Sequence, residues 1–173
     1  KLNLIMYEAL CKLGRFEDAM PCALRNLAGS DFIGYYTDAK ERVKKLLKIL
    51  PKENAYKIIE TVSQEVDRTH YAMKFHFYMG QVFFELRRGN EARAQIATAL
   101  KISPEFEPNW YEMGRIKETF FHDYKGAIAD YQEAIKLQPM DFTNLQPYRR
   151  LLRRLRKSDS DLALKLKMLS PTR

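Results

Sequence analysis

The feature that most constrains this chain is a repeat of about 36 residues. One alanine anchors each repeat, and the anchors are Ala19, Ala55, Ala92, Ala127 and Ala163, spaced 36, 37, 35 and 36 residues apart. Self-similarity at this period predicts a stack of like units, each burying its apolar face on its neighbours. In this register the 173 residues form a single repeat domain of five repeats, at approximately 1–35, 36–72, 73–106, 107–141 and 142–173.

The third and fourth repeats match each other most closely. Gly80 and Gly114 precede the anchor alanines of their repeats, and the fourth repeat carries one inserted residue between the glycine and the alanine. Both repeats end alike, in ALKISP and AIKLQP. Proline cannot continue a helical hydrogen-bond ladder, so Pro104 and Pro139 are expected to end a helix.

The local pattern within the repeats is helical. Ala39, Val43, Leu46, Leu47 and Leu50 recur at the spacing that places them on one helix face. Asn-Gly and Asp-Gly hairpin turns and sustained alternation of apolar and polar residues are missing from the sequence. We therefore predict an all-α chain of about ten helices in antiparallel pairs.

The fourth repeat resembles the tetratricopeptide repeat, a helix–turn–helix unit of about 34 residues. The matching positions are Trp110, Met113, Gly114, Ala127, Tyr131, Ala134 and Pro139. The resemblance implies a right-handed α-solenoid in which the first helix of each pair lines a concave face that binds proteins or peptides. The second repeat lacks the glycine and the proline, and the fifth lacks the early aromatic residue and is expected to be a weak or capping repeat.

The positive charge of the chain is concentrated in two segments. The net charge is +8, and the segments 40–52 and 149–157 each hold six basic residues, whereas the two together hold one acidic residue. The remainder of the chain has 18 basic and 21 acidic residues. A local field of this kind attracts a specific acidic partner, whereas a diffuse charge mostly aids solubility.

Both basic segments fall on helices that the resemblance places along the concave face. The residues expected to line this groove are Lys40, Lys44, Lys48, Phe77, Gln81, Phe84, Tyr111, Arg115, Arg150, Arg153 and Arg154. Arginine can form paired hydrogen bonds with a carboxylate, and lysine adds point charges. We predict a non-catalytic protein-interaction scaffold that binds an acidic, extended peptide or an acidic partner surface in a basic groove.

The sequence offers no catalytic or metal-binding pattern. His70 and His76 are six residues apart, which is the wrong spacing for one helix face, and Cys11 and Cys22 form no C-x-x-C motif. Clustered glycines that could cradle a phosphate are also missing. We therefore expect neither an enzyme nor a bound metal or cofactor.

Two other functions remain open at this point. Clustered basic residues with interspersed aromatic residues also suit nucleic acid or another polyanion. Alternatively, the chain is a docking or oligomerisation domain of a larger enzyme such as a transferase, because it begins at Lys1 in the middle of the repeat pattern and is expected to be a piece of a larger protein. The sequence shows no signal peptide and no apolar run long enough to span a membrane, so a cytoplasmic location is expected.

Overall fold

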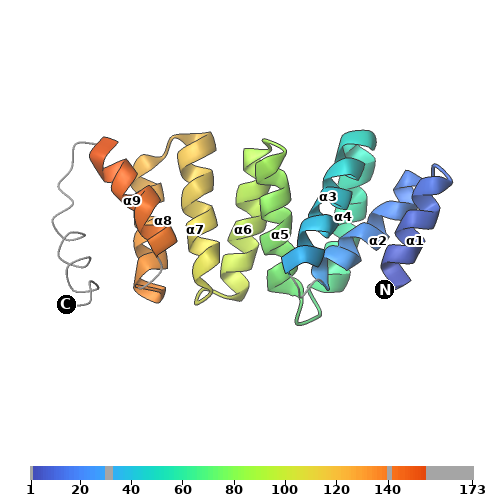
Figure 1. Cartoon of the computed structure of the whole chain (residues 1–173), viewed down its shortest axis with the longest axis horizontal. Helices are drawn as coiled ribbons and strands as arrows, with labels where there is room; N and C mark the ends of the chain where they lie inside the picture. The colour runs from blue at the N-terminus through green and yellow to red at the C-terminus, as the bar shows by residue number, and fades with distance from the viewer. Residues whose placement is uncertain (1, 30–32, 140–141, 155–173) are drawn as a thin grey trace. The chain divides into compact units, whose positions relative to one another are not determined.

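The computed structural model describes residues 2–29, 33–139 and 142–154. Over this part of the chain it contains α-helices and one π-helical turn, and no strand (Figure 1). The elements are α1 (Leu2–Lys12), α2 (Phe16–Ala28), α3 (Ile33–Ile49), α4 (Lys52–Val66), α5 (Ala72–Glu85), α6 (Gly89–Ile102), α7 (Glu107–Ile116), η1 (Lys117–Phe121), α8 (Tyr124–Leu137) and α9 (Phe142–Arg154). The tenth helix that the repeat pattern predicts would fall in residues 155–173, outside the described residues.

By its internal packing the chain divides into two compact units, Lys1–Ile102 and Ser103–Arg173, called unit 1 and unit 2 below. Unit 1 holds α1 to α6, and unit 2 holds α7, η1, α8 and α9. The continuity of all five repeats in one domain stays a prediction.

Small side chains lie where the helices approach one another. In unit 1, α1 packs on α2 and α5 packs on α6, while α2 also contacts α3 and α4. The alanines Ala19, Ala92, Ala99, Ala127 and Ala134 are all fully buried. The repeat register therefore identified core positions correctly.

The turns inside three of the helix pairs share one backbone conformation. Gly14, Arg87 and His122 have φ angles of 72°, 60° and 52°, in the left-handed region. After α1, the N–H of Arg15 donates to the carbonyl oxygen of Leu10 (2.9 Å), and after α5 the N–H of Arg88 donates to that of Phe83 (2.9 Å). This is the Schellman arrangement, which satisfies the last carbonyls of a helix. It places α1 and α5 in the same register, with Leu10 equivalent to Phe83.

The inserted residue of the fourth repeat is accommodated in η1. A π-helical turn contains one residue more than the α-helical turn it replaces. The turn lies between Gly114 and Ala127, on the stretch where the fourth repeat is one residue longer than the third. The helices on either side of this turn, α7 and α8, therefore keep the register of the third repeat.

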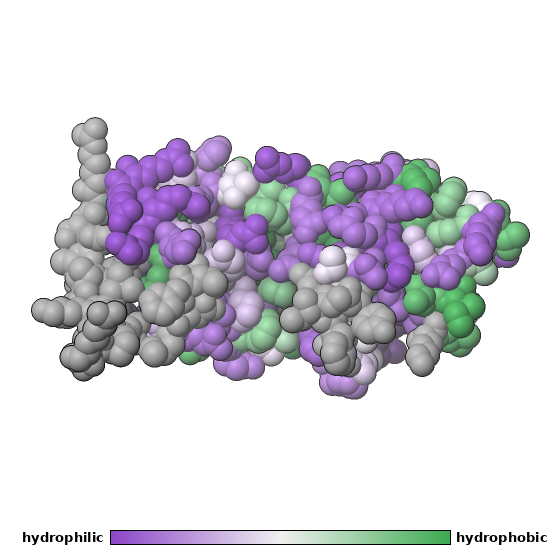
Figure 2. Space-filling model, viewed as in Figure 1, coloured by the Kyte–Doolittle hydropathy of each residue, from purple (hydrophilic) through white to green (hydrophobic). Residues whose placement is uncertain are grey.

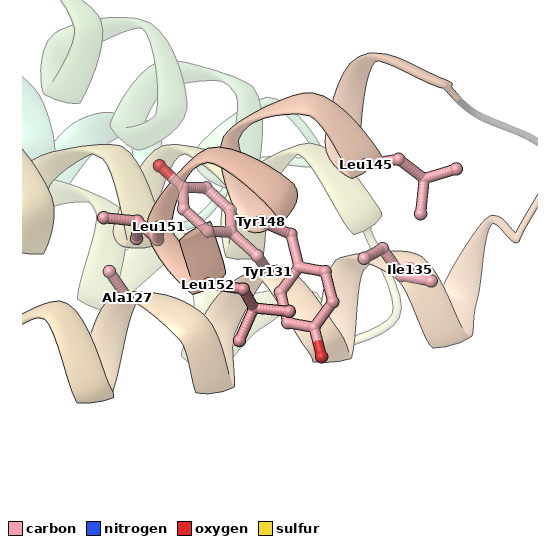
Figure 3. Close-up of a cluster of buried hydrophobic side chains, with 7 residues drawn as sticks. All are labelled: Ala127, Tyr131, Ile135, Leu145, Tyr148, Leu151 and Leu152. Carbon is pink, nitrogen blue, oxygen red and sulfur yellow. The ribbon is translucent and has the colours of Figure 1, made fainter. Parts of the chain in front are cut away.

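The core of unit 2 lies between α8 and α9 (Figure 3). Its buried side chains are Ala127, Tyr131, Ile135, Leu145, Tyr148, Leu151 and Leu152. Leu151 and Leu152 point into this core. Because helical residues one or two positions apart point in different directions, the arginines of α9 lie on its opposite face, at the surface.

Candidate functional site

The eleven residues predicted to line a groove lie on α3, α5, α7 and α9, as the repeat register requires. Those on α3 and α5 belong to unit 1, and those on α7 and α9 belong to unit 2. The predicted residues therefore fall into two groups with different surroundings.

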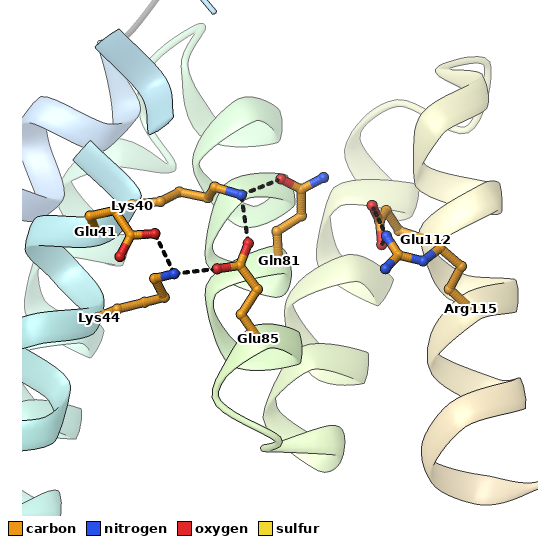
Figure 4. Close-up of polar contacts among 7 residues, drawn as sticks. All are labelled: Lys40, Glu41, Lys44, Gln81, Glu85, Glu112 and Arg115. Carbon is orange, nitrogen blue, oxygen red and sulfur yellow. Dashed lines mark hydrogen bonds and ion pairs between the residues drawn. The ribbon is translucent and has the colours of Figure 1, made fainter. Parts of the chain in front are cut away.

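In unit 1, two of the predicted lysines share one glutamate. The Nζ of Lys40 lies 2.8 Å from Oε1 of Glu85 and 3.4 Å from Oε1 of Gln81. The Nζ of Lys44 pairs with the other carboxylate oxygen of Glu85 and with Glu41 (Figure 4). We call Lys40, Glu41, Lys44 and Glu85 the lysine–glutamate cluster.

The pairing changes how these groups titrate. Burial opposes the charged form of Glu85, but hydrogen bonds and charge attraction from Lys40 and Lys44 outweigh it and lower the pKa of this carboxyl. Burial likewise opposes the charge of Lys44, yet its bonds to Glu41 and Glu85 raise the pKa of the ammonium group. The cluster holds two positive and two negative charges, and Lys40 is only 8% exposed. This part of the basic segment therefore presents no net positive charge.

The other predicted residues of unit 1 are mixed in exposure. Lys48 is exposed near the end of α3. Phe77 and Phe84 are half-buried, and the ring of Phe77 lies 5.5 Å from that of Tyr78. These aromatic side chains are thus partly covered by the protein itself and are not fully available to a ligand.

In unit 2, the predicted residues of α7 also have partners within the protein. Nη1 of Arg115 lies 3.0 Å from both carboxylate oxygens of Glu112, which is buried (Figure 4). The guanidinium carbon of Arg115 lies 5.8 Å from the ring centre of Tyr111, and that ring lies 5.9 Å from the ring of Tyr131. Tyr111 and Arg115 are both half-buried.

The arginines of α9 are the most accessible basic group among the predicted residues. Nη2 of Arg150 lies 2.7 Å from both carboxylate oxygens of Glu118, yet the Arg150 side chain remains 65% exposed. Arg153 is exposed, and Arg154 stacks at 4.6 Å over the ring of Tyr124. In the part of the chain that the structure describes, no acidic side chain pairs with Arg153.

A hollow of about 440 Å³ lies against this face of α9. The described residues that line it are Gln146, Arg149, Arg150 and Arg153, and we call it the arginine hollow. Nε of Arg149 is buried and has no hydrogen-bond partner in the described structure. Arg149 belongs to the basic segment but was missing from the predicted site, because the repeat register did not place it on the concave face.

Metal-ligating side chains do not cluster in the part of the chain that the structure describes. Within residues 2–29, 33–139 and 142–154, no group of three or more His, Cys, Asp or Glu residues could hold a metal ion. Buried His76 instead bonds to Asp67 and Gln95, with both distances 2.7 Å. No helix of this same part of the chain is both long and apolar enough to cross a membrane.

Comparison with known proteins adds evidence on the fold. No protein-family model and no curated protein sequence matches the chain. Among solved structures, the one described as the MamA RS-1 ArsTM double mutant is 15% identical, with 97% of this chain and 92% of that chain covered and a TM-score of 0.56. A second MamA crystal structure is 13% identical, with coverages of 96% and 87% and the same TM-score. MamA is a helical tetratricopeptide-repeat protein, so the likeness confirms the predicted all-α solenoid of antiparallel helix pairs.

Proposed function

We propose that this chain is a non-catalytic protein-interaction scaffold that binds an acidic segment of its partner through the arginines of α9. The observation that carries the proposal is the arginine hollow, where three arginines and one glutamine on one face of α9 line an open volume. A guanidinium group presents two parallel N–H donors that match the two oxygens of a carboxylate. Several such groups around one hollow suit a run of Asp and Glu side chains.

The lysine–glutamate cluster is a poorer receptor for the same ligand. An incoming carboxylate would have to displace Glu41 or Glu85, which already accept bonds from the two lysines. Around the arginine hollow, Glu118 pairs with Arg150 only, and exposed Arg153 has no acidic partner among the described residues. This difference favours unit 2 over unit 1 as the acidic-ligand site.

The test is a binding titration with a fluorescent peptide rich in Asp and Glu. We compare Arg153→Glu with Lys125→Glu, which makes the same change of net charge at an exposed position of α8 in the same unit. Arg153→Glu should raise Kd about tenfold or more, equivalent to about 1.4 kcal/mol, whereas Lys125→Glu should change it by less than about threefold. Equal effects of the two variants would show that net charge alone, and not the arginine hollow, attracts the peptide.

Single-stranded RNA serves as the second ligand in the same titration. Binding to RNA without binding to the peptide would select the polyanion alternative in place of this proposal. In that case the logarithm of affinity should fall steeply with the logarithm of salt concentration, as counterion release requires.

A further inference from the structure

One arginine that lines the arginine hollow is already bound by an acidic side chain of the protein itself. Both carboxylate oxygens of Glu118 lie 2.7 Å from Nη2 of Arg150. The Arg150 side chain is 65% exposed, whereas the Glu118 side chain is only 13% exposed. Figure 2 shows hydrophilic surface over α9, the helix that carries Arg150. Glu118 thus binds, from within the protein, the same guanidinium group that a ligand would reach from solvent.

A buried tyrosine holds the Glu118 carboxylate in place. The hydroxyl of Tyr131 donates to Oε2 of Glu118 at 3.1 Å, and the Tyr131 side chain is fully buried in the core of unit 2. Burial and, after it, the negative charge of Glu118 raise the pKa of the Tyr131 hydroxyl, so this group keeps the proton that it donates. Glu118 is therefore bonded to α8 independently of its contact with Arg150.

The π-helical turn η1 carries Glu118 at a position that the repeat register assigns to the predicted groove. Counted from the glycine of each repeat, Glu118 corresponds to Phe84, one of the residues predicted to line that groove. The preceding residue, Lys117, bonds to Asp130 at 2.9 Å, so two successive residues of η1 are joined to two successive residues of α8. The fourth repeat therefore holds a fixed carboxylate where the third repeat has an aromatic side chain.

We propose that Glu118 is an intramolecular competitor, which lowers the affinity of the arginine hollow for an acidic ligand by binding Arg150 in the free protein. The inference rests on the proposed function, since it concerns the same site and the same ligand. A ligand carboxylate can use Nη2 of Arg150 only by displacing Glu118, and Glu118 is always at high effective concentration because it belongs to the same chain. Arg153, which has no acidic partner among the described residues, stays available to the ligand.

The titration with the fluorescent acidic peptide measures this competition. Glu118→Gln keeps the shape of the side chain and an oxygen that accepts from Tyr131, but removes the charge. It should lower Kd about three- to fivefold, the effect expected for an exposed ion pair. The control Glu133→Gln makes the same change of net charge on α8, and should change Kd by less than about twofold, because Glu133 pairs with Lys136 and salt screens its effect on the hollow. An unchanged Kd for Glu118→Gln would overturn the inference, and so would a raised Kd, which would mean that Glu118 orients Arg150 for the ligand.

A double-mutant cycle shows whether Glu118 acts through Arg150. Arg150→Gln alone should raise Kd, because it removes one arginine of the hollow. In the Arg150→Gln background, Glu118→Gln should lower Kd by less than about twofold, since the group that Glu118 occupies is gone. Equal tightening with and without Arg150 would overturn the inference, because it would show that the charge of Glu118 repels the peptide without occupying this arginine. Urea unfolding followed by Trp110 fluorescence verifies that each variant is folded.

Two results separate the failure of this inference from the failure of the proposed function. If the parent binds the peptide and Arg153→Glu weakens that binding, but Glu118→Gln does not tighten it, only the role of Glu118 as a competitor is wrong. If neither the parent nor Glu118→Gln binds the peptide, the proposed function is wrong and the inference fails with it.

Discussion

Replacing Gly114 with alanine tests how closely α7 and α8 approach. A Cβ atom on Gly114 would lie 2.7, 2.9 and 3.1 Å from Cε1, Cδ1 and Cζ of Tyr131. Tyr131 is fully buried, its hydroxyl donates to Glu118 at 3.1 Å, and its ring packs on Tyr111. A rigid ring held at both ends cannot move aside, so the added methyl group must push the two helices apart.

Two effects of opposite sign decide the size of the change. Alanine is more favourable than glycine inside a helix by about 0.8–1 kcal/mol. Overpacking a well-filled core costs about 1–3 kcal/mol, occasionally more. Because the closest contacts fall well below van der Waals separation, we take the upper part of that range. The net expectation for Gly114→Ala is a loss of about 1–2 kcal/mol in the free energy of unfolding.

The assay is urea unfolding followed by the fluorescence of Trp110, the only tryptophan of the chain, which reports on unit 2. The matched control is Ala129→Gly at an exposed position of α8, which measures the helix-propensity effect in the same unit without a clash. The double variant Gly114→Ala with Tyr131→Leu should lose less stability than the sum of the two single variants, because the smaller side chain makes room for the methyl group. If Gly114→Ala raised the midpoint by as much as Ala129→Gly lowers it, the close-contact reasoning would be refuted.

Two further predictions concern unit 1. Glu85→Gln should lower the free energy of unfolding, measured in urea at pH 7, by less than about 1 kcal/mol, because the cluster is partly exposed. The Glu85 carboxylate stabilises the fold above its unfolded pKa of 4.5, and this contribution is lost as pH falls through the lower folded pKa, so the stabilities of the variant and the parent should converge as the pH is lowered below 4.5. Gly14→Ala should destabilise by roughly 1 kcal/mol from backbone strain alone, since its φ is 72° and a Cβ would meet nothing within 4 Å. Arg87→Gly should instead stabilise the chain and raise its midpoint of thermal unfolding. Equal midpoints for the parent and both variants would contradict the left-handed turn that Gly14 and Arg87 share.

The sequence was sufficient for the fold because the fold is a local, repeated pattern. The anchor alanines recur at a fixed interval, and those of the first four repeats are buried where helices meet. The extra residue before Ala127 was visible by counting, although its conformation was not. A count shows that a residue is inserted, whereas the backbone decides between a longer loop and a π-helical turn.

The candidate site was harder to predict because charge pairing is not local. Lys40 and Glu85 are 45 residues apart, and only the packing of α3 near α5 brings them together. Counting basic residues within one segment therefore overestimated the field of unit 1. The pair of Glu112 and Arg115 is different, since a spacing of three on a helix is visible in the sequence.

The turn η1 has a consequence for how such repeats can be recombined. Because the additional residue is stored inside a helical segment, the two ends of that repeat keep the geometry of a shorter one. Modules cut from this chain should therefore be aligned on the left-handed residue of each turn, at positions 14, 87 and 122, rather than by residue number. Repeats of different length can then be exchanged, provided that the inserted residue is kept together with the π-helical turn that contains it.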